Sequence, residues 1–366
     1  MSAAPDPLAF VSLADYHRPV GESAGAWKRI GEDLRKRLGL GADATVAAFD
    51  DLERLSADTV RALTPEPSYG TFKSDLDTHV SDWLGDADAP SVMLIVYPPA
   101  SRERFLSEWG ESRGLAVRSC RDALAEPDWI DGTRAIIQAE GAVVVPDIHN
   151  AFLRRFGGLD LIAHLLAAIS GSPHKVVVGC NSWAWTFLEK AVDADHFLPA
   201  PIAPQAVDAA HLRDWFREAT RDCGFVFHSL ATGGDVFADA DPFFDDLAIS
   251  SLGTPWSAWS LWRESLYHRQ SDNSQAIWVR LPDKVAIPSS ERRRALFILH
   301  ALLIHGGLAP DALSEVLPSN VPQSLVALLT RTGIVSLEEG RLDVTPRAYP
   351  AVRAALANAG FPLGAL

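Results

Sequence analysis

The segment 91–106, SVMLIVYPPASRERFL, has the setting of a phosphate-binding loop but not its chemistry. An apolar run at 92–96 leads through a Pro-rich turn into an amphipathic stretch, which is the context of the pattern G-x-x-x-x-G-K-[ST]. Aligned on that pattern, the positions of the first Gly, the second Gly, the Lys and the Ser/Thr are taken, in that order, by Tyr97, Arg102, Glu103 and Arg104. The glycines, the cation and the Mg²⁺-binding hydroxyl that hold a phosphate are therefore all replaced.

Glu103 would place a negative charge near the phosphates of a bound nucleotide. At ~4 Å and an effective dielectric constant of ~20, a pair of unit charges interacts by about 4 kcal/mol. Exchanging the attraction of a Lys for the repulsion of a Glu would therefore weaken phosphate binding by several kcal/mol, less with solvent screening. Arg102 and Arg104 could still contact a phosphate, but a guanidinium cannot hold Mg²⁺. A plain buried strand followed by a loop and a helix explains the segment equally well.

Two further apolar runs end in a polar residue. GAVVVPDIHN, at 141–150, ends its apolar run at Asp147, which Ile148 follows. HKVVVGCNSWAW, at 174–185, ends its apolar run at Asn181. Because ligands of open α/β sheets bind beyond the carboxyl ends of the strands, we expect Tyr97, Asp147 and Asn181 to converge there.

The order of these segments resembles that of AAA/STAND-type P-loop ATPases, over roughly residues 68–366. Residues 141–150 are similar to a Walker B strand, and residues 174–185 are similar to a sensor-1 strand. The Walker B resemblance implies that Asp147 has the position of the Mg²⁺ ligand and that Ile148 has replaced the general base. SSLGTPWSAWSLWRESL, at 250–266, looks like the helix of an AAA lid, with Trp256 where the family commonly has a sensor-2 Arg. The resemblance implies an α/β fold with a P-loop NTPase-like (AAA-type) parallel sheet core, a helical lid and a C-terminal winged helix.

Four regions follow from this pattern: an N-terminal helical region (1–67), a degenerate P-loop NTPase-like core (68–205), a lid subdomain with a hairpin (206–285) and a winged helix (286–366). In the N-terminal region, helices are expected near 24–38 and 47–63. The expected core elements are helices at 75–84, 101–111, 129–140 and 159–170, and strands at 92–96, 116–120, 141–147, 176–178 and 196–202. In the lid, a helix is expected at 208–221, and Gly233-Gly234 predicts a hairpin over 225–238. The C-terminal region should contain helices at 291–305, 310–317, 321–332 and 347–359, with a hairpin at 334–344.

Charge and composition narrow the range of partners. The net charge of −14 argues against broad affinity for nucleic acid or anionic lipid. No apolar run approaches the length of a membrane span, and the three scattered cysteines indicate reduced thiols in a cytoplasm. In the C-terminal region, Arg331 and Arg341 are the candidate DNA contacts, but residues 289–366 have seven arginines against six acids, which is not a strongly basic surface.

Other residues are less informative for function. His300 and His305 are five residues apart on an expected helix and are poorly spaced for one metal ion. Arg154 and its neighbour Arg155 could act in trans in a ring only if a phosphate site were functional. Trp183, just after Asn181, is expected to fill or border the strand-end cleft.

The sequence therefore predicts a cytoplasmic, catalytically inactive pseudo-ATPase that acts as a protein-interaction or regulatory module and is not an enzyme. It predicts a protein partner and allows an oligomer, with no membrane insertion and no required cofactor. Two alternatives stay open. One is a winged-helix DNA-binding regulator. The other is a noncanonical nucleotide-binding signalling protein of the STAND type, without efficient hydrolysis, in which ATP or ADP is a structural ligand.

Overall fold

The computed structural model describes residues 10–19, 52–67, 69–99, 104–139, 141–269, 275–289, 291–317 and 322–366. The described residues fall into two compact units. One contains the described residues of 18–66 and 206–284, and the other contains those of 7–17, 67–205 and 285–366. The predicted boundaries after 67, 205 and 285 lie within one residue of boundaries between these units. Residues 67–205 share a unit with the C-terminal region, and residues 52–66 share the other with residues 206–284.

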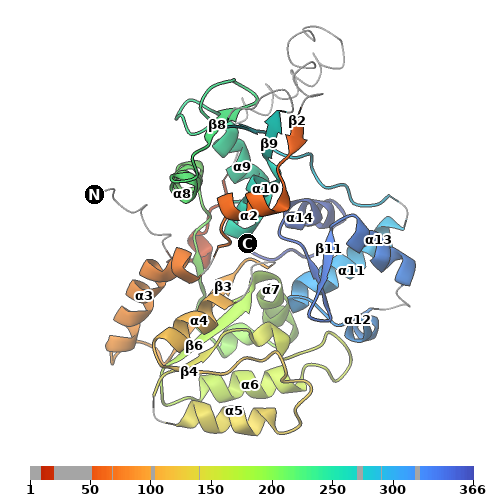
Figure 1. The fold of residues 1–366 in the computed structure, drawn as a ribbon. Helices are drawn as coiled ribbons and strands as arrows, with labels where there is room; N and C mark the ends of the chain where they lie inside the picture. Colours follow the sequence, from red (N-terminus) through yellow and green to blue (C-terminus); the bar gives the residue numbers. More distant parts are fainter. Residues whose placement is uncertain are drawn as a thin grey trace. The chain divides into compact units, whose positions relative to one another are not determined.

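A six-stranded sheet forms the centre of the larger unit (Figure 1). Its spatial order is β1-β7-β3-β6-β5-β4, and all pairs are parallel except β1 with β7. The strands are β1 (Phe10–Ser12), β3 (Val92–Tyr97), β4 (Ala116–Val117), β5 (Val143–Val145), β6 (Val176–Asn181) and β7 (Ile202–Pro204). Every residue of β3, β5 and β6 is buried, as expected of parallel strands covered on both faces. The predicted α/β fold with a parallel sheet core is confirmed.

Helices cover this sheet. They are α3 (Tyr69–Gly85), α4 (Arg104–Ser112), α5 (Trp129–Gln138), α6 (Asp160–Ser170) and α7 (Ser182–Ala191). Leu76 of α3 and Trp109 of α4 belong to one apolar cluster with Ile95 and Tyr97 of β3. Helices α5 and α6 lie side by side (Figure 1). Helices α4, α5 and α6 follow the predicted ranges closely, because their apolar residues recur with helical spacing. Helix α3 begins before its expected range of 75–84, and α7 was not predicted.

Two elements differ from their predicted ranges: a strand of the larger unit and a helix of the N-terminal region. The strand expected at 196–202 is β7, Ile202–Pro204, and the chain before it contains the short 3₁₀ helix η3 (Ala194–His196). Pro199 and Pro201 lack the N–H that a strand needs, which delays the pairing. The helix expected at 47–63 begins only at α2 (Ala57–Leu63), where the Ser56 hydroxyl accepts a hydrogen bond from the Thr59 N–H. The helix expected at 24–38 lies outside the described residues.

The smaller unit contains helices and a four-stranded sheet of order β2-β9-β10-β8. Its elements are β2 (Leu52–Arg54), α2, α8 (Ala209–Thr220), β8 (Val226–Ser229), α9 (Phe243–Ser251), α10 (Pro255–Glu264), β9 (Leu266–Arg269) and β10 (Ala276–Val279). The expected hairpin is not the main pairing: β8 runs parallel to β10, and the chain returning after Gly233 meets β8 at a single bridge, His228 with Asp235. Trp262 lies at the centre of an aromatic core, and its ring is 5.0 Å from that of Phe216.

The C-terminal region has the predicted element order. It comprises α11 (Arg292–His305), α12 (Pro310–Val316), α13 (Gln323–Arg331), β11 (Val335–Glu338), β12 (Arg341–Val344) and α14 (Tyr349–Asn358). Strands β11 and β12 pair antiparallel, and Glu339 and Gly340 both have positive φ, as a two-residue hairpin turn requires. Its interpretation as a winged helix rests on this order.

Candidate functional site

The carboxyl ends of β3, β5 and β6 bring the predicted strand-end residues to one edge of the sheet. Tyr97 and Asn181 are direct register partners on β3 and β6. The Tyr97 side chain is only 1% exposed, and its hydroxyl donates to the Pro146 carbonyl oxygen at 2.8 Å. The aromatic ring therefore lies within the core, with its hydroxyl bonded to the chain that leaves β5.

Asp147 binds protein groups with both of its carboxylate oxygens. One oxygen accepts from the Cys120 backbone N–H at 2.7 Å, and the other accepts from the Ser119 hydroxyl at 2.7 Å and the Asn150 amide at 3.2 Å. The side chain is buried, at 6% exposure. These contacts connect the loop after β4 to the loop after β5. Ile148, in the predicted general-base position, is buried in the short 3₁₀ helix η2 (Ile148–Asn150).

Asn181 caps a helix. Its side-chain oxygen accepts from the backbone N–H groups of Trp183 and Ala184, at 3.0 and 2.8 Å, which fixes the start of α7. Its amide nitrogen donates to the Ile304 carbonyl oxygen of α11 at 3.3 Å. A polar residue at the end of β6 thus joins the sheet to the C-terminal region.

The structure describes only some of the residues predicted to align with a phosphate-binding loop. Arg102 and Glu103 lie outside the described residues, and Arg104 is exposed at the first position of α4. The described strand-end residues do not fit a conventional phosphate and Mg²⁺ site, because Tyr97 occupies the loop position and Asp147 already binds three protein donors. Among the described residues, no group of three or more His, Cys, Asp and Glu is arranged to hold a metal ion.

The C-terminal region packs directly against this edge. The Arg341 guanidinium donates to the Asn150 side-chain oxygen at 2.9 Å and to the Gly307 carbonyl oxygen at 2.7 Å. The Arg154 backbone N–H donates to His305 Nε2 at 3.4 Å. Of the two predicted DNA contacts, Arg331 is exposed at the end of α13, whereas Arg341 is held inside this contact. That position does not favour Arg341 as a DNA contact, and both roles stay predictions.

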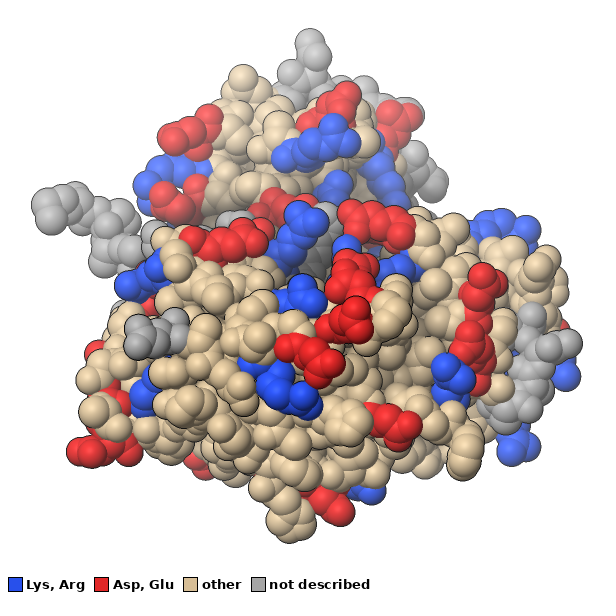
Figure 2. All heavy atoms as spheres, turned by 90° about the horizontal axis from the view of Figure 1, so that it is seen from below, with Lys and Arg blue, Asp and Glu red and all other residues tan. Residues whose placement is uncertain are grey.

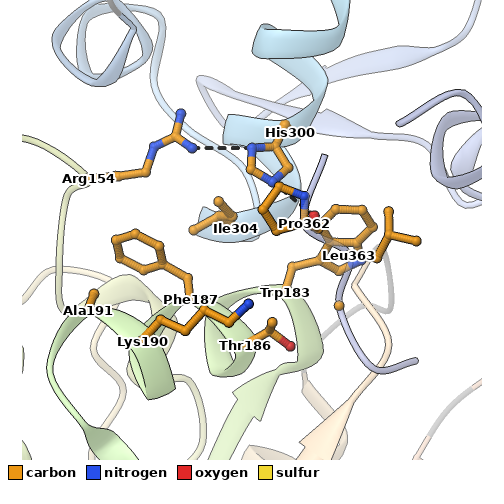
Figure 3. Close-up of a pocket in the computed structure, with 11 residues that line it drawn as sticks. Arg154, Trp183, Thr186, Phe187, Lys190, Ala191, His300, Ile304, Pro362 and Leu363 are labelled. Carbon is orange, nitrogen blue, oxygen red and sulfur yellow. Dashed lines mark hydrogen bonds between the residues drawn. The ribbon is translucent and has the colours of Figure 1, made fainter. Parts of the chain in front are cut away.

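A cavity of about 240 Å³ opens beside this contact (Figure 3). It is lined from α7, from α11, from the loop after β5 and from the C-terminal segment after α14. Its polar side chains include Arg154, Lys190 and His300, and its rings are those of Trp183 and Phe187. The sequence singles out Arg154, Trp183 and His300 separately, but it gives no reason to group them or to add Lys190 and Phe187. His300 is more than a hundred residues from the others along the chain, so only folding brings it to them.

The electrostatics of the cavity depend on Arg154 and His300. Arg154 Nη1 and His300 Nδ1 are 3.2 Å apart, and His300 Nε2 is 3.3 Å from the Pro362 carbonyl oxygen. Since a guanidinium only donates, His300 accepts with Nδ1 and donates with Nε2, and the ring is neutral. Burial, and then the charge of Arg154, lower the pKa of His300 to about 4. Burial also lowers the pKa of Arg154.

Charge is mixed on the surface that Figure 2 shows. Basic side chains lie among acidic ones on this face, and uncharged surface separates many of them. A DNA-reading protein usually presents a clear basic face. Within the part of the chain that the structure describes, no helix is long and apolar enough to cross a lipid bilayer.

No protein-family model and no curated protein matches the chain. Solved structures similar to it include the ORC1 protein of Aeropyrum pernix in complex with DNA, at 14% identity and a TM-score of 0.39, with 85% of this chain and 97% of that chain covered. The RuvB Holliday junction branch migration motor of Thermotoga maritima is similar at 14% identity and a TM-score of 0.36, with 82% and 99% covered. A Walker-type ATPase of Pyrococcus abyssi is similar at 12% identity and a TM-score of 0.34, with 81% and 99% covered.

These comparisons correct one prediction. Solved structures similar to the chain include a Walker-type ATPase and a branch migration motor, so the prediction that the protein is not an enzyme is wrong as stated. The geometry of the strand ends concerns only how a phosphate would be bound. It does not show that the protein lacks catalytic activity. At these low identities the similarity concerns the fold and assigns no substrate or partner to this chain.

Proposed function

We propose that the protein is a protein-interaction or regulatory module built on its AAA-like core. The observation that carries the proposal is Phe156, a large aromatic side chain that is fully exposed in the loop between β5 and α6. Large aromatic residues are enriched among the side chains that dominate binding energy at protein interfaces. Exposure of a single apolar side chain is common in proteins and does not by itself indicate an interface. The proposal therefore depends on the contacts that fix the loop around Phe156.

The loop that carries Phe156 is a closed turn. The Leu153 backbone N–H donates to the Gly158 carbonyl oxygen at 3.0 Å, and the Gly158 N–H donates to the Arg155 carbonyl oxygen at 3.0 Å. A Cβ atom at Gly158 would lie only 2.2 Å from the Leu153 carbonyl oxygen, so the turn needs glycine there. Gly157 has a φ of +68°, a backbone conformation that glycine adopts without steric cost.

A salt bridge also holds the turn in place. Arg155 Nε lies 3.1 Å from Glu315 Oε2 of α12, which connects the turn to the C-terminal region. A preformed turn loses less conformational entropy on binding than a flexible loop does. These contacts support Phe156 as a preorganised anchor for a partner protein.

We propose that the protein and its partner meet in the cytoplasm. The described cysteines are all free thiols, which supports the proposed cytoplasmic location. A second copy of the chain is one candidate partner, so the solution mass of the purified protein should be measured together with its binding.

Partner capture with matched variants tests this function. Tagged wild type, Phe156→Ser and the control Leu124→Ser are each exposed to protein extract of the source organism, and the bound proteins are quantified. Leu124 is a suitable control because it is also an exposed apolar residue, at 48%. We expect Phe156→Ser to lose at least one saturable partner that Leu124→Ser keeps, or to lose self-association measured by sedimentation. Identical partners and identical mass for all three proteins would contradict the proposal.

A further inference from the structure

We infer that the cavity between α7 and α11 binds a small organic anion, whose apolar body lies against Trp183 and Phe187 and whose carboxylate or phosphate is bound by Arg154. This site differs from the strand-end residues, because neither Tyr97 nor Asp147 lines it. The inference goes beyond the proposed function and does not depend on Phe156.

Arg154 supplies a charge without a partner acid. Its side chain is half-buried, and across the described residues it makes no salt bridge with a carboxylate. Its guanidinium has five N–H donors, and the one hydrogen bond seen from it goes to the neutral His300 ring. Burying a cation is costly unless it is paired, so the site favours an anion that completes the pairing.

Lys190 adds a second positive charge. It lies on α7, across the cavity from Arg154 and His300, as Figure 3 shows. No acidic residue is among those that line the cavity. The charge of the lining is therefore positive only, which selects an anionic ligand over a neutral or cationic one.

The remaining walls are apolar. The Trp183 indole nitrogen donates to the Tyr349 hydroxyl at 3.2 Å, so the polar atom of this ring is already used and its apolar surface remains for the cavity. The Phe187 ring is stacked on that of Phe152 at 5.4 Å, which holds it in place. Ile304 and Leu363 complete these walls. Such a lining, apolar with a few placed polar groups, is typical of small-molecule sites.

The C-terminal segment forms one wall by close approach. A Cβ atom at Gly364 would lie 2.7 Å from the Trp183 ring, and the Arg353 guanidinium donates to the Gly364 carbonyl oxygen at 2.9 Å. The wall is thus fixed by packing and hydrogen bonds. The volume of about 240 Å³ is below the range of about 300–1,000 Å³ usual for drug-sized ligands, so it suits a single-ring compound.

Fluorine NMR of the full chain with three matched probes tests the inference. The probes are 4-fluorobenzoate, 4-fluorophenyl phosphate and the neutral 4-fluorobenzamide, each titrated with wild-type protein. We expect at least one anion to bind about tenfold or more tightly than the amide, because a charge-assisted hydrogen bond is stronger than a neutral one. The stronger of the two anions identifies the carboxylate or the phosphate as the bound group.

Charge-removing variants locate the site. Arg154→Gln should lower the affinity for the bound anion by about tenfold, towards that of the amide, and Lys190→Gln should lower it by less. Lys190 is exposed, so its variant tests the site even where Arg154→Gln disturbs folding. The control Arg134→Gln removes an exposed cation of α5 and should leave the affinity unchanged. Absence of binding by both anions, equal binding of the amide, or binding that neither cavity variant alters would overturn the inference.

Discussion

At the scale of single residues, the hydrogen bonds of Asp147 connect the loop after β4 to the loop after β5. Asp147→Asn replaces one accepting oxygen by a donor, so it must lose a bond from Cys120, Ser119 or Asn150 inside a buried site. We expect the free energy of unfolding to fall by about 1–3 kcal/mol, the cost of leaving a buried polar group unsatisfied. Urea denaturation measures it, with Asp131→Asn on the exposed face of α5 as the control. Equal losses in the two variants would mean that the network around Asp147 contributes little.

Cys120 is a second residue whose chemistry follows from its surroundings. Burial raises the pKa of its thiol well above 9.0, and the negative charge of Asp147 raises it further. Because the thiolate is the reactive form, we expect iodoacetamide to label partly exposed Cys223 in the native protein and to spare Cys120 and Cys180. Mass spectrometry of native Cys223→Ser at pH 8 checks this. Rapid labelling of that variant without denaturant would show that the buried thiols are accessible.

At the scale of elements, the strand β12 contributes to the contact between the C-terminal region and the sheet. Arg341→Ala removes two hydrogen bonds and leaves the Asn150 side-chain oxygen and the Gly307 carbonyl oxygen without this donor. We expect a loss of about 2 kcal/mol in the free energy of unfolding. Arg331→Ala, on the exposed end of α13, should change it by no more than about 0.5 kcal/mol. The two variants are compared by chemical denaturation, and equal stability would remove the structural role of Arg341.

Elements with local signals were predictable, and elements that depend on distant partners were not. Helices such as α6 and α11 follow from apolar periodicity, and the apolar runs of β3 and β6 predict buried strands. The pairing of β8 with β10 was missed, since the nearby Gly233-Gly234 turn favours a hairpin and a parallel partner leaves no local trace. The same holds for the cavity, whose Arg154 and His300 meet only after folding.

At the scale of the whole larger unit, contacts within the protein occupy the edge of the sheet where a ligand would be expected. The edge of the sheet where ligands of open α/β folds usually bind is occupied by contacts from α11 and β12. Asn181, at the end of β6, and Asn150, in η2 after β5, both bind the C-terminal region. We therefore expect the core and the C-terminal region to unfold together, as a single cooperative unit.

This contact also predicts how stability depends on pH. Burial first, and then the charge of Arg154, lower the pKa of His300 to about 4. The same two causes, followed by smaller effects of His149, Arg341 and His300, lower the pKa of His305 to about 3. The ordinary value is 6.5, so the unfolded chain binds protons before the folded one as the pH falls. This contribution is therefore complete above pH 6.5 and declines progressively towards pH 4 and 3. It amounts to roughly a few kcal/mol for each histidine, since each unit of pKa corresponds to about 1.36 kcal/mol.

The decline between pH 7 and 5 separates these histidines from carboxylates, whose ordinary pKa values are near 4. Thermal unfolding of wild type across that range should show a falling melting temperature, and the fall should be smaller in His300→Gln and in His305→Gln. His164→Gln, on the exposed side of α6, should keep the wild-type slope. A slope that is the same in all four proteins would show that the two buried rings do not control the response. If only His300→Gln reduced the slope, the pH response would be assigned to the pairing of His300 with Arg154.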